Sequence, residues 1–193
     1  MSERISFQGE PGANSHIAAH EAYPNLEPLP CPSFEDAFAA VKEGQALYAM
    51  IPVENSVAGR VADVHTLIPE SNLYIIAERF VPIRHQLLGL KGAKLDGLTH
   101  VRSHPQALGQ CRKQLRDLGV VAVKTADTAG AAREIAELGD PKIGALASSL
   151  AAEIYGLDVL KADIADAAHN TTRFLVFSRE EQRAPANNGP CMT

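Results

Sequence analysis

The stretch Leu47-Tyr48-Ala49-Met50-Ile51-Pro52-Val53-Glu54-Asn55-Ser56 runs from apolar residues directly into a carboxylate, an amide and a hydroxyl. Its apolar part, Leu47–Val53, has the length and composition of a buried β-strand. A strand that ends in polar side chains delivers them to one edge of its sheet, and open α/β sheets bind ligands at that edge. The stretch therefore predicts an α/β sheet with Glu54, Asn55 and Ser56 at a binding site.

Outward from this stretch, short apolar runs alternate along the chain with segments of helical periodicity. This alternation is typical of an α/β fold with mostly parallel strands. The other predicted strands are Arg4–Gln8, Leu73–Leu90 with a break at Pro82, His100–Ser103, Val120–Lys124, Lys142–Ala147 and Arg173–Ser178. The predicted helices are Asn14–Ala22, Phe34–Glu43, Val61–Ile68, Gln106–Leu118, Thr128–Leu138 and Ser148–Tyr155.

The long apolar segment after Asn72 contains Pro82 and predicts strands that carry the chain from one lobe into another. We expect a first lobe of residues 1–78, to which the chain returns in residues 165–179. Residues 79–164 would form the second lobe, and the polar tail, residues 180–193, would be a linker. Two lobes joined by two crossings create a cleft, which is a favoured position for a ligand site.

Composition narrows the class of protein. The 193 residues are 46% hydrophobic and 21% charged, as in a globular domain with an ordinary core. The formal net charge of -5 favours neither nucleic acid nor an anionic membrane as a partner. Three separated cysteines and a charged N-terminus predict a reduced, cytoplasmic protein. His16 and His20 have helical spacing but lack a third ligand, so we expect no metal site.

Several strand-to-helix junctions place Gly, Ser, Thr or Asn where a helix begins. Helix capping explains any one of them, at about 1 kcal/mol each. If the junctions converge on a cleft, they would also present backbone N–H groups to an anion. The junctions are Gln8–Gly12, Pro52–Gly59, Ser103–Gln106, Thr125–Thr128 and Ala147–Ser149. In the third of them Pro105 suits a first helical turn, which leaves the amide of Gln106 free.

The segment Asn170-Thr171-Thr172-Arg173-Phe174 places two hydroxyls and a guanidinium just before an apolar run. One interpretation is an ordinary edge strand, with Thr for β-propensity and Arg on the solvent face. The other is a carboxylate site, because the fork of Arg173 can bond both oxygens of a carboxylate. The spacing alone leaves both interpretations open.

Together these motifs resemble the signature blocks of the prephenate dehydratase family, in the family order. The resemblance rests on Pro52-Val53-Glu54-Asn55-Ser56 with Gly59, on Ser103-His104-Pro105-Gln106-Ala107-Leu108, and on Asn170-x-Thr172-Arg173-Phe174. Phe7-Gln8-Gly9-x-x-Gly12-Ala13-x-Ser15 and Tyr155-Gly156-Leu157 add to it. It extends from about Ile5 to Ser178, nearly the whole chain.

The resemblance implies two small α/β lobes with the active site in the cleft between them, similar to type II periplasmic binding proteins. It implies neither metal nor organic cofactor, and a homodimer or higher homo-oligomer. It makes Thr172 and Arg173 the expected catalytic residues. The expected substrate-binding residues are Glu54, Asn55, Ser56, Ser103, His104, Gln106, Asn170 and Phe174. The family usually continues into an ACT domain that binds phenylalanine, and this chain leaves almost no room for one.

The implied reaction is the loss of CO2 and water from prephenate, which leaves an aromatic ring. Our hypothesis is that Thr172 donates to the departing hydroxyl and that Arg173 meets a carboxylate or orients the motif. Two alternatives stay open. Arogenate dehydratase acts on a substrate with an amine in place of the side-chain keto group, and a non-catalytic small-anion binding module could use the same architecture.

Overall fold

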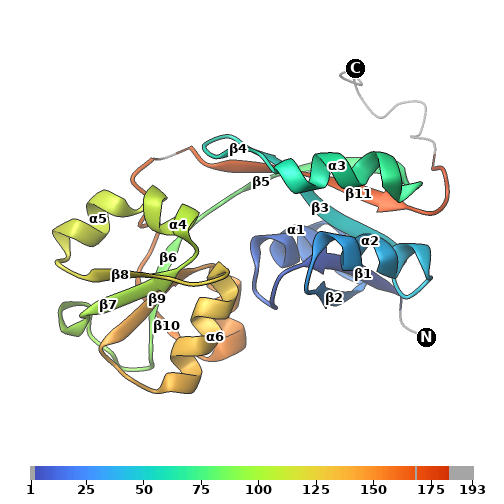
Figure 1. The fold of residues 1–193 in the computed structure, drawn as a ribbon. Helices are drawn as coiled ribbons and strands as arrows, with labels where there is room; N and C mark the ends of the chain where they lie inside the picture. Colours follow the sequence, from blue (N-terminus) through green and yellow to red (C-terminus); the bar gives the residue numbers. More distant parts are fainter. Residues whose placement is uncertain (1–2, 168, 183–193) are drawn as a thin grey trace.

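The chain folds into two α/β lobes in a computed structural model that describes residues 3–167 and 169–182 (Figure 1). The first lobe contains a sheet with the strand order β2-β1-β3-β11-β5, and the hairpin strand β4 pairs with β3. Its strands are β1 (Arg4–Gln8), β2 (Glu27–Cys31), β3 (Tyr48–Asn55), β4 (Gly59–Arg60), β5 (Tyr74–Pro82) and β11 (Thr171–Ser178). Its helices are α1 (Asn14–Ala22), α2 (Phe34–Lys42) and α3 (Ala62–Ser71).

The second lobe contains a sheet with the strand order β10-β6-β9-β7-β8. Its strands are β6 (Gln86–Gly89), β7 (His100–Ser103), β8 (Val121–Lys124), β9 (Ile143–Ala147) and β10 (Asp158–Lys161). Its helices are α4 (Pro105–Gln110), α5 (Arg112–Asp117), α6 (Thr128–Leu138) and α7 (Ser149–Tyr155), with a short 3-10 turn at Leu95–Gly97.

Both sheets follow one plan. In each, a central strand pairs in parallel with two neighbours: β1 with β2 and β3, and β7 with β8 and β9. The first strand after each crossing between the lobes then joins this parallel set in the antiparallel direction. In the first lobe β11 pairs with β3, and in the second lobe β6 pairs with β9. A final strand pairs antiparallel with the crossing strand. This arrangement confirms the expected class of two α/β lobes similar to type II periplasmic binding proteins. The expectation of mostly parallel strands was wrong, because the strands that follow each crossing pair antiparallel and make both sheets mixed.

Helices cover both faces of each sheet. In the first lobe α2 and α3 pack on one face through Phe38, Val41 and Val64, and α1 packs on the other through Ala18 and Ala19. In the second lobe α6 and α7 cover one face, while α4 and α5 cover the other. Each sheet is therefore the middle of three layers, as apolar strands that are buried on both faces require.

Two chain segments connect the lobes and lie side by side. The Ile83 N–H donates to the Asn170 carbonyl over 2.8 Å, and the Ile164 N–H donates to the His85 carbonyl over 2.9 Å. We expected the first crossing near residue 78, and β5 in fact stays in the first sheet as far as Pro82. Residues 183–193 of the expected linker lie outside the described residues. Within the described part, no helix combines the length and apolar character needed to cross a membrane.

Candidate active site

A cleft of about 530 Å³ lies between the two lobes. Its lining comes from the first lobe (such as Gln8, Asn55 and Thr172), from the crossing segments (His85 and Asn170) and from the second lobe (such as Gln106 and Asp127). A second cavity of about 340 Å³ adjoins it and shares Ala58, Gln106, Gln110 and Asn170. Four of the five predicted junctions contribute residues to the cleft lining, and the fifth, at Ala147–Ser149, does not.

Asn55 and Thr172 lie opposite each other at the paired ends of β3 and β11. Both side chains are buried, and the Asn55 Nδ2 donates to Thr172 Oγ1 over 2.9 Å. The Asn55 Oδ1 accepts from the backbone N–H groups of Val57 and Ala58, at 3.0 and 2.9 Å. Because two backbone donors fix the oxygen side of this amide, its nitrogen side must face Thr172.

The same amide extends the network towards the second lobe. Asn55 Nδ2 also donates to Asn170 Oδ1 over 2.7 Å, and Asn170 Nδ2 donates to Gln110 Oε1 over 2.9 Å. Gln110 Oε1 lies 2.6 Å from His85 Nε2. A chain of four hydrogen bonds thus runs from Thr172 in the first lobe to Gln110 on α4 and His85 in the crossing segment. Its members are buried or partly buried, so each bond is stronger than it would be in water.

Helix N-termini also point to this cleft. Asn14 and Ser15 begin α1, and Thr128 begins α6 after its cap Asp127, and all four line the cleft. The first turn of a helix carries free N–H groups and partial positive charge. These N-termini offer donors to an anion in the cleft, although the carboxylates of Asp63 and Asp127 also line it.

Six of the ten predicted site residues line the cleft: Asn55, His104, Gln106, Asn170, Thr172 and Phe174. His104 caps α4, where its Nδ1 accepts the Gln106 N–H over 3.3 Å. Phe174 is buried and lies on the same face of β11 as Thr172, since side chains two residues apart on a strand share a face.

The other four predicted residues lie outside the cleft lining. Ser103 is fully buried, and its hydroxyl donates to the Leu146 carbonyl over 2.7 Å, so it joins β7 to β9. Ser56 Oγ accepts the Thr171 N–H over 3.0 Å and supports β11. Glu54 is exposed and points away from the cleft, because its neighbour Asn55 points into it. These three residues support or flank the site.

Arg173, which we expected either to meet a carboxylate or to orient the motif, lies outside the cleft lining. Its Nε and a terminal nitrogen both lie 2.9 Å from Glu78 Oε2, and the guanidinium carbon lies 6.0 Å from the centre of the Phe80 ring. Strand alternation explains this position: Thr172 faces the cleft, so the next residue on β11 faces outward.

Polar cleft residues that the sequence analysis missed include Gln110, His85 and Arg60. Arg60 is the only arginine or lysine among the described residues that line the cleft. The described part of the chain contains no group of three or more His, Cys, Asp or Glu side chains that could hold a metal ion.

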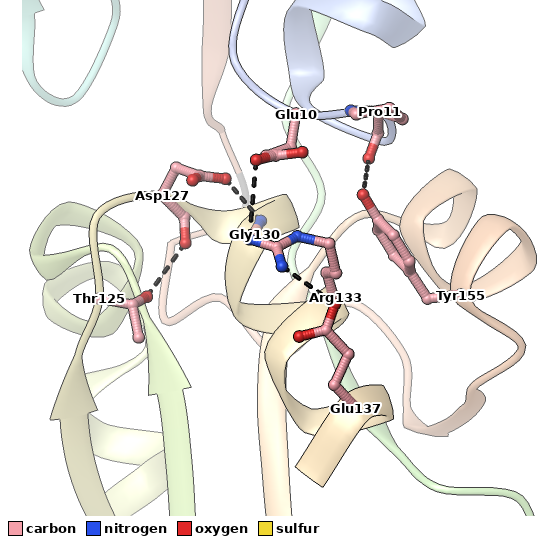
Figure 2. Close-up of polar contacts among 8 residues, drawn as sticks. All are labelled: Glu10, Pro11, Thr125, Asp127, Gly130, Arg133, Glu137 and Tyr155. Atoms are coloured by element: carbon pink, nitrogen blue, oxygen red, sulfur yellow. Dashed lines mark hydrogen bonds and ion pairs between the residues drawn. The ribbon is translucent and has the colours of Figure 1, made fainter. Parts of the chain in front are cut away.

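Opposite the crossing segments, a set of contacts ties the loop of residues 9–13 to the second lobe. The Tyr155 hydroxyl donates to the Pro11 carbonyl over 2.9 Å, and the Ser148 hydroxyl donates to the Gly12 carbonyl over 2.6 Å. Arg133 on α6 lies 3.7 Å from Glu10 (Figure 2). We call these three contacts the clasp. With the crossing segments they join the lobes at two places.

The sequence profile described as prephenate dehydratase matches residues 5–182. The chain belongs to the prephenate dehydratase family. It is 44% identical over 189 residues to a bifunctional N-acyl-homoserine lactone acylase/prephenate dehydratase of Komagataeibacter europaeus, covering 98% of this chain and 67% of that protein. It is 46% identical over 177 residues to arogenate dehydratase/prephenate dehydratase 1 of Arabidopsis thaliana, covering 92% of this chain and 45% of that protein.

A solved structure gives the same result. The prephenate dehydratase of Arthrobacter aurescens, crystallised with L-Phe, matches with a TM-score of 0.85 and 30% identity. The match covers 93% of this chain and 61% of that protein. The chain thus spans less than two thirds of that family member and under half of the Arabidopsis relative.

Proposed function

We propose that the chain is the catalytic part of a prephenate dehydratase, a carbon–oxygen lyase that converts prephenate into phenylpyruvate, CO2 and water. Family membership supports the reaction class. The observation that carries the assignment within the cleft is the bond from Asn55 to Thr172. It occupies the Thr172 oxygen as an acceptor, so the hydroxyl hydrogen is free to donate into the cleft.

In the proposed reaction the bond from the ring to its carboxylate breaks and releases CO2. The electron pair forms the last ring double bond and expels the ring hydroxyl, which takes up one proton and leaves as water. Thr172 would donate a hydrogen bond to that departing oxygen. A threonine hydroxyl is a weak acid, so its contribution comes from preorganised polarity and positioning rather than from acidity.

Prephenate is a dianion, and its charge needs compensation in a protein of net charge -5. We propose that Arg60 meets one carboxylate, because it is the cationic residue among the described cleft-lining side chains. The N-termini of α1 and α6 would add partial positive charge. Gln106 and Gln110 would supply neutral donors to the remaining oxygens.

The name of the Komagataeibacter relative also includes an acylase activity. The hydrogen-bond partner of Thr172 bears on whether this residue suits such a reaction. Acyl transfer from an amide needs a hydroxyl whose proton is removed by a base. The hydrogen-bond partner of Thr172 Oγ1 among the described residues is an amide that donates. This arrangement favours a hydroxyl that donates a hydrogen bond to a leaving group over one that attacks a carbonyl.

Arogenate is the second candidate substrate, because the Arabidopsis relative carries both activities in its name. Turnover of purified chain should be measured with prephenate and separately with arogenate, following phenylpyruvate and phenylalanine. We expect prephenate to react, and Thr172→Ala to lower kcat by roughly 10²–10⁴-fold, the range for a lost proton donor. Thr172→Ser should keep most of the activity.

Equal turnover in wild type and Thr172→Ala would refute the role of Thr172. Binding of prephenate without turnover would instead favour the binding-module alternative.

We also propose a cytoplasmic homo-oligomer. The location is supported by the free, buried thiols of Cys31 and Cys111. Light scattering of the purified chain tests the oligomeric state.

A further inference from the structure

His85 lies between β5 and β6, where the chain crosses from one lobe to the other. The residue is 4% exposed, and its carbonyl accepts the Ile164 N–H from the returning crossing segment over 2.9 Å. This backbone hydrogen bond holds His85 in place within the crossing segment, and from there the residue lines the cleft. Its Nε2 lies 2.6 Å from Gln110 Oε1.

The network determines which nitrogen of His85 carries the proton. Asn55 donates to Asn170 Oδ1, so the other side of the Asn170 amide is a donor, and it faces Gln110. The Gln110 atom at this junction is consequently an acceptor oxygen. His85 Nε2 must then carry a hydrogen to donate to it. Burial lowers the pKa of His85, with the Gln110 bond opposing the shift, which favours a neutral ring with its proton on Nε2.

Two donors thus meet at Gln110 Oε1, His85 from one side and Asn170 from the other. The amide nitrogen of Gln110 makes no hydrogen bond to the described residues, and Gln110 lines both cavities. With its oxygen held twice, this amide has one orientation, in which the NH2 group is available to an acceptor in the cleft. A carboxylate or hydroxyl oxygen of a small acidic substrate is such an acceptor.

We propose that His85 is a positioning residue, which donates from Nε2 to Gln110 and so presents the Gln110 NH2 to an oxygen of the substrate. The proposal rests on the dehydratase function proposed above. His85 acts through Gln110 rather than on the reacting atoms. Loss of the donor would let the Gln110 side chain rotate away from its position, and misplacement by about 1 Å can cost about 100-fold in rate.

The test compares three variants of His85. In His85→Gln the side-chain amide reaches the place of the imidazole Nε2, whereas the shorter amide of His85→Asn reaches only the place of Nδ1. His85→Phe keeps the ring shape without a donor. We expect kcat/KM to fall roughly 10–100-fold in His85→Phe and His85→Asn, and to recover to within about threefold of wild type in His85→Gln. A purely structural role would rank the variants by ring shape and melting temperature instead.

A double-mutant cycle with Gln110→Ala shows whether His85 changes kcat/KM through Gln110. If His85 acts through Gln110, His85→Phe should change kcat/KM by less than about twofold once Gln110 is alanine. An equal fall with and without Gln110 overturns the proposal, and so does a His85→Phe variant as active as wild type.

NMR of the imidazole nitrogens gives a readout that needs no turnover. We expect the Nε2–H form of His85 in wild type and a shifted Gln110 side-chain NH2 resonance in His85→Phe. An Nδ1–H form, or an unmoved Gln110 resonance, overturns the proposal. If wild-type chain turns over neither prephenate nor arogenate, the proposed function fails. The NMR results would still decide whether His85 donates from Nε2 to Gln110.

Discussion

Asn55 Nδ2 donates a hydrogen bond to Thr172 Oγ1 over 2.9 Å, and backbone N–H groups of Val57 and Ala58 hold the other end of the same amide. A short turn after β3 thereby fixes the direction of a bond at the start of β11. The two strands come from residues more than a hundred positions apart. Because the turn orients the Asn55 amide so that it donates to Thr172, the hydrogen of the Thr172 hydroxyl remains available to the substrate.

Reversing this bond should stop catalysis. In Asn55→Asp the side chain keeps its shape but offers only acceptors, so the Thr172 hydroxyl would donate to it and no longer to the substrate. We expect kcat to fall by roughly 10²-fold or more, the lower end of the range for a lost proton donor. Steady-state kinetics with prephenate measure it.

Asn72→Asp is the matched control, since it adds the same negative charge at an exposed residue that ends α3. We expect its kcat to stay within about twofold of wild type. Unchanged kcat in Asn55→Asp would show that the direction of the Asn55–Thr172 bond is irrelevant to the reaction.

Arg173 should be dispensable for substrate binding, because it pairs with Glu78 on the outer face of β11. Arg173→Gln should leave KM for prephenate within about twofold and lower the free energy of unfolding by no more than about 1 kcal/mol, as for a half-exposed ion pair. Arg79→Gln, at an exposed position on β5, is the control for the loss of a positive charge. A tenfold rise in KM confined to Arg173→Gln would mean that Arg173 turns into the cleft when substrate binds.

Much of the fold follows from local sequence patterns, and its exceptions have physical causes. Helices α1 and α6 begin and end where periodicity predicts. Strand β2 was not predicted, since its sequence Glu27–Cys31 contains two prolines, which an edge strand tolerates because one row of its N–H groups is unpaired. The helix predicted at Gln106–Leu118 is instead two helices that meet at Cys111, two residues after Gly109, a residue that disfavours a helix interior.

The site was predictable to the extent that it lies at strand and helix ends. Strand alternation alone would have corrected two of our assignments. Asn55 and Thr172 face the cleft, so their neighbours Glu54 and Arg173 face away from it. Gln110 and His85 could not be found in this way, because their role depends on a contact between α4 and the crossing segment. No periodicity in either segment indicates that contact.

The clasp makes Gly12 a sensitive position. Its φ is +91°, and an added Cβ would lie 2.7 Å from Ala151 Cα in the second lobe. Gly12→Ala should therefore push the loop of residues 9–13 away from α7 and widen the cleft. We expect a lower melting temperature and a fall of roughly tenfold or more in kcat/KM, since small misplacements of reacting groups are costly.

Gly92→Ala is the control that separates the effect of backbone strain from the effect of pushing Gly12 away from the second lobe. Gly92 has a φ of +79°, but nothing lies within 4 Å of the place that an added Cβ would occupy. Both variants incur the strain of the left-handed region, about 1–2 kcal/mol. Only Gly12→Ala should lose activity. Equal activity in both variants would show that the cleft does not depend on the clasp.

Stability at high pH should depend on Cys111, which is fully buried against α5 and the second sheet. Burial raises the pKa of this thiol from 9.0 to about 12. The folded state thus holds the proton after the unfolded chain has lost it, so this contribution is complete below pH 9 and is lost between pH 9 and about 12. Across that interval the free energy of unfolding of wild type should fall faster than that of Cys111→Ala, by up to about 1.4 kcal/mol per pH unit. Urea titrations of both proteins at several pH values measure the difference. Parallel pH profiles would mean that the thiol ionises as readily in the folded protein as in the unfolded chain.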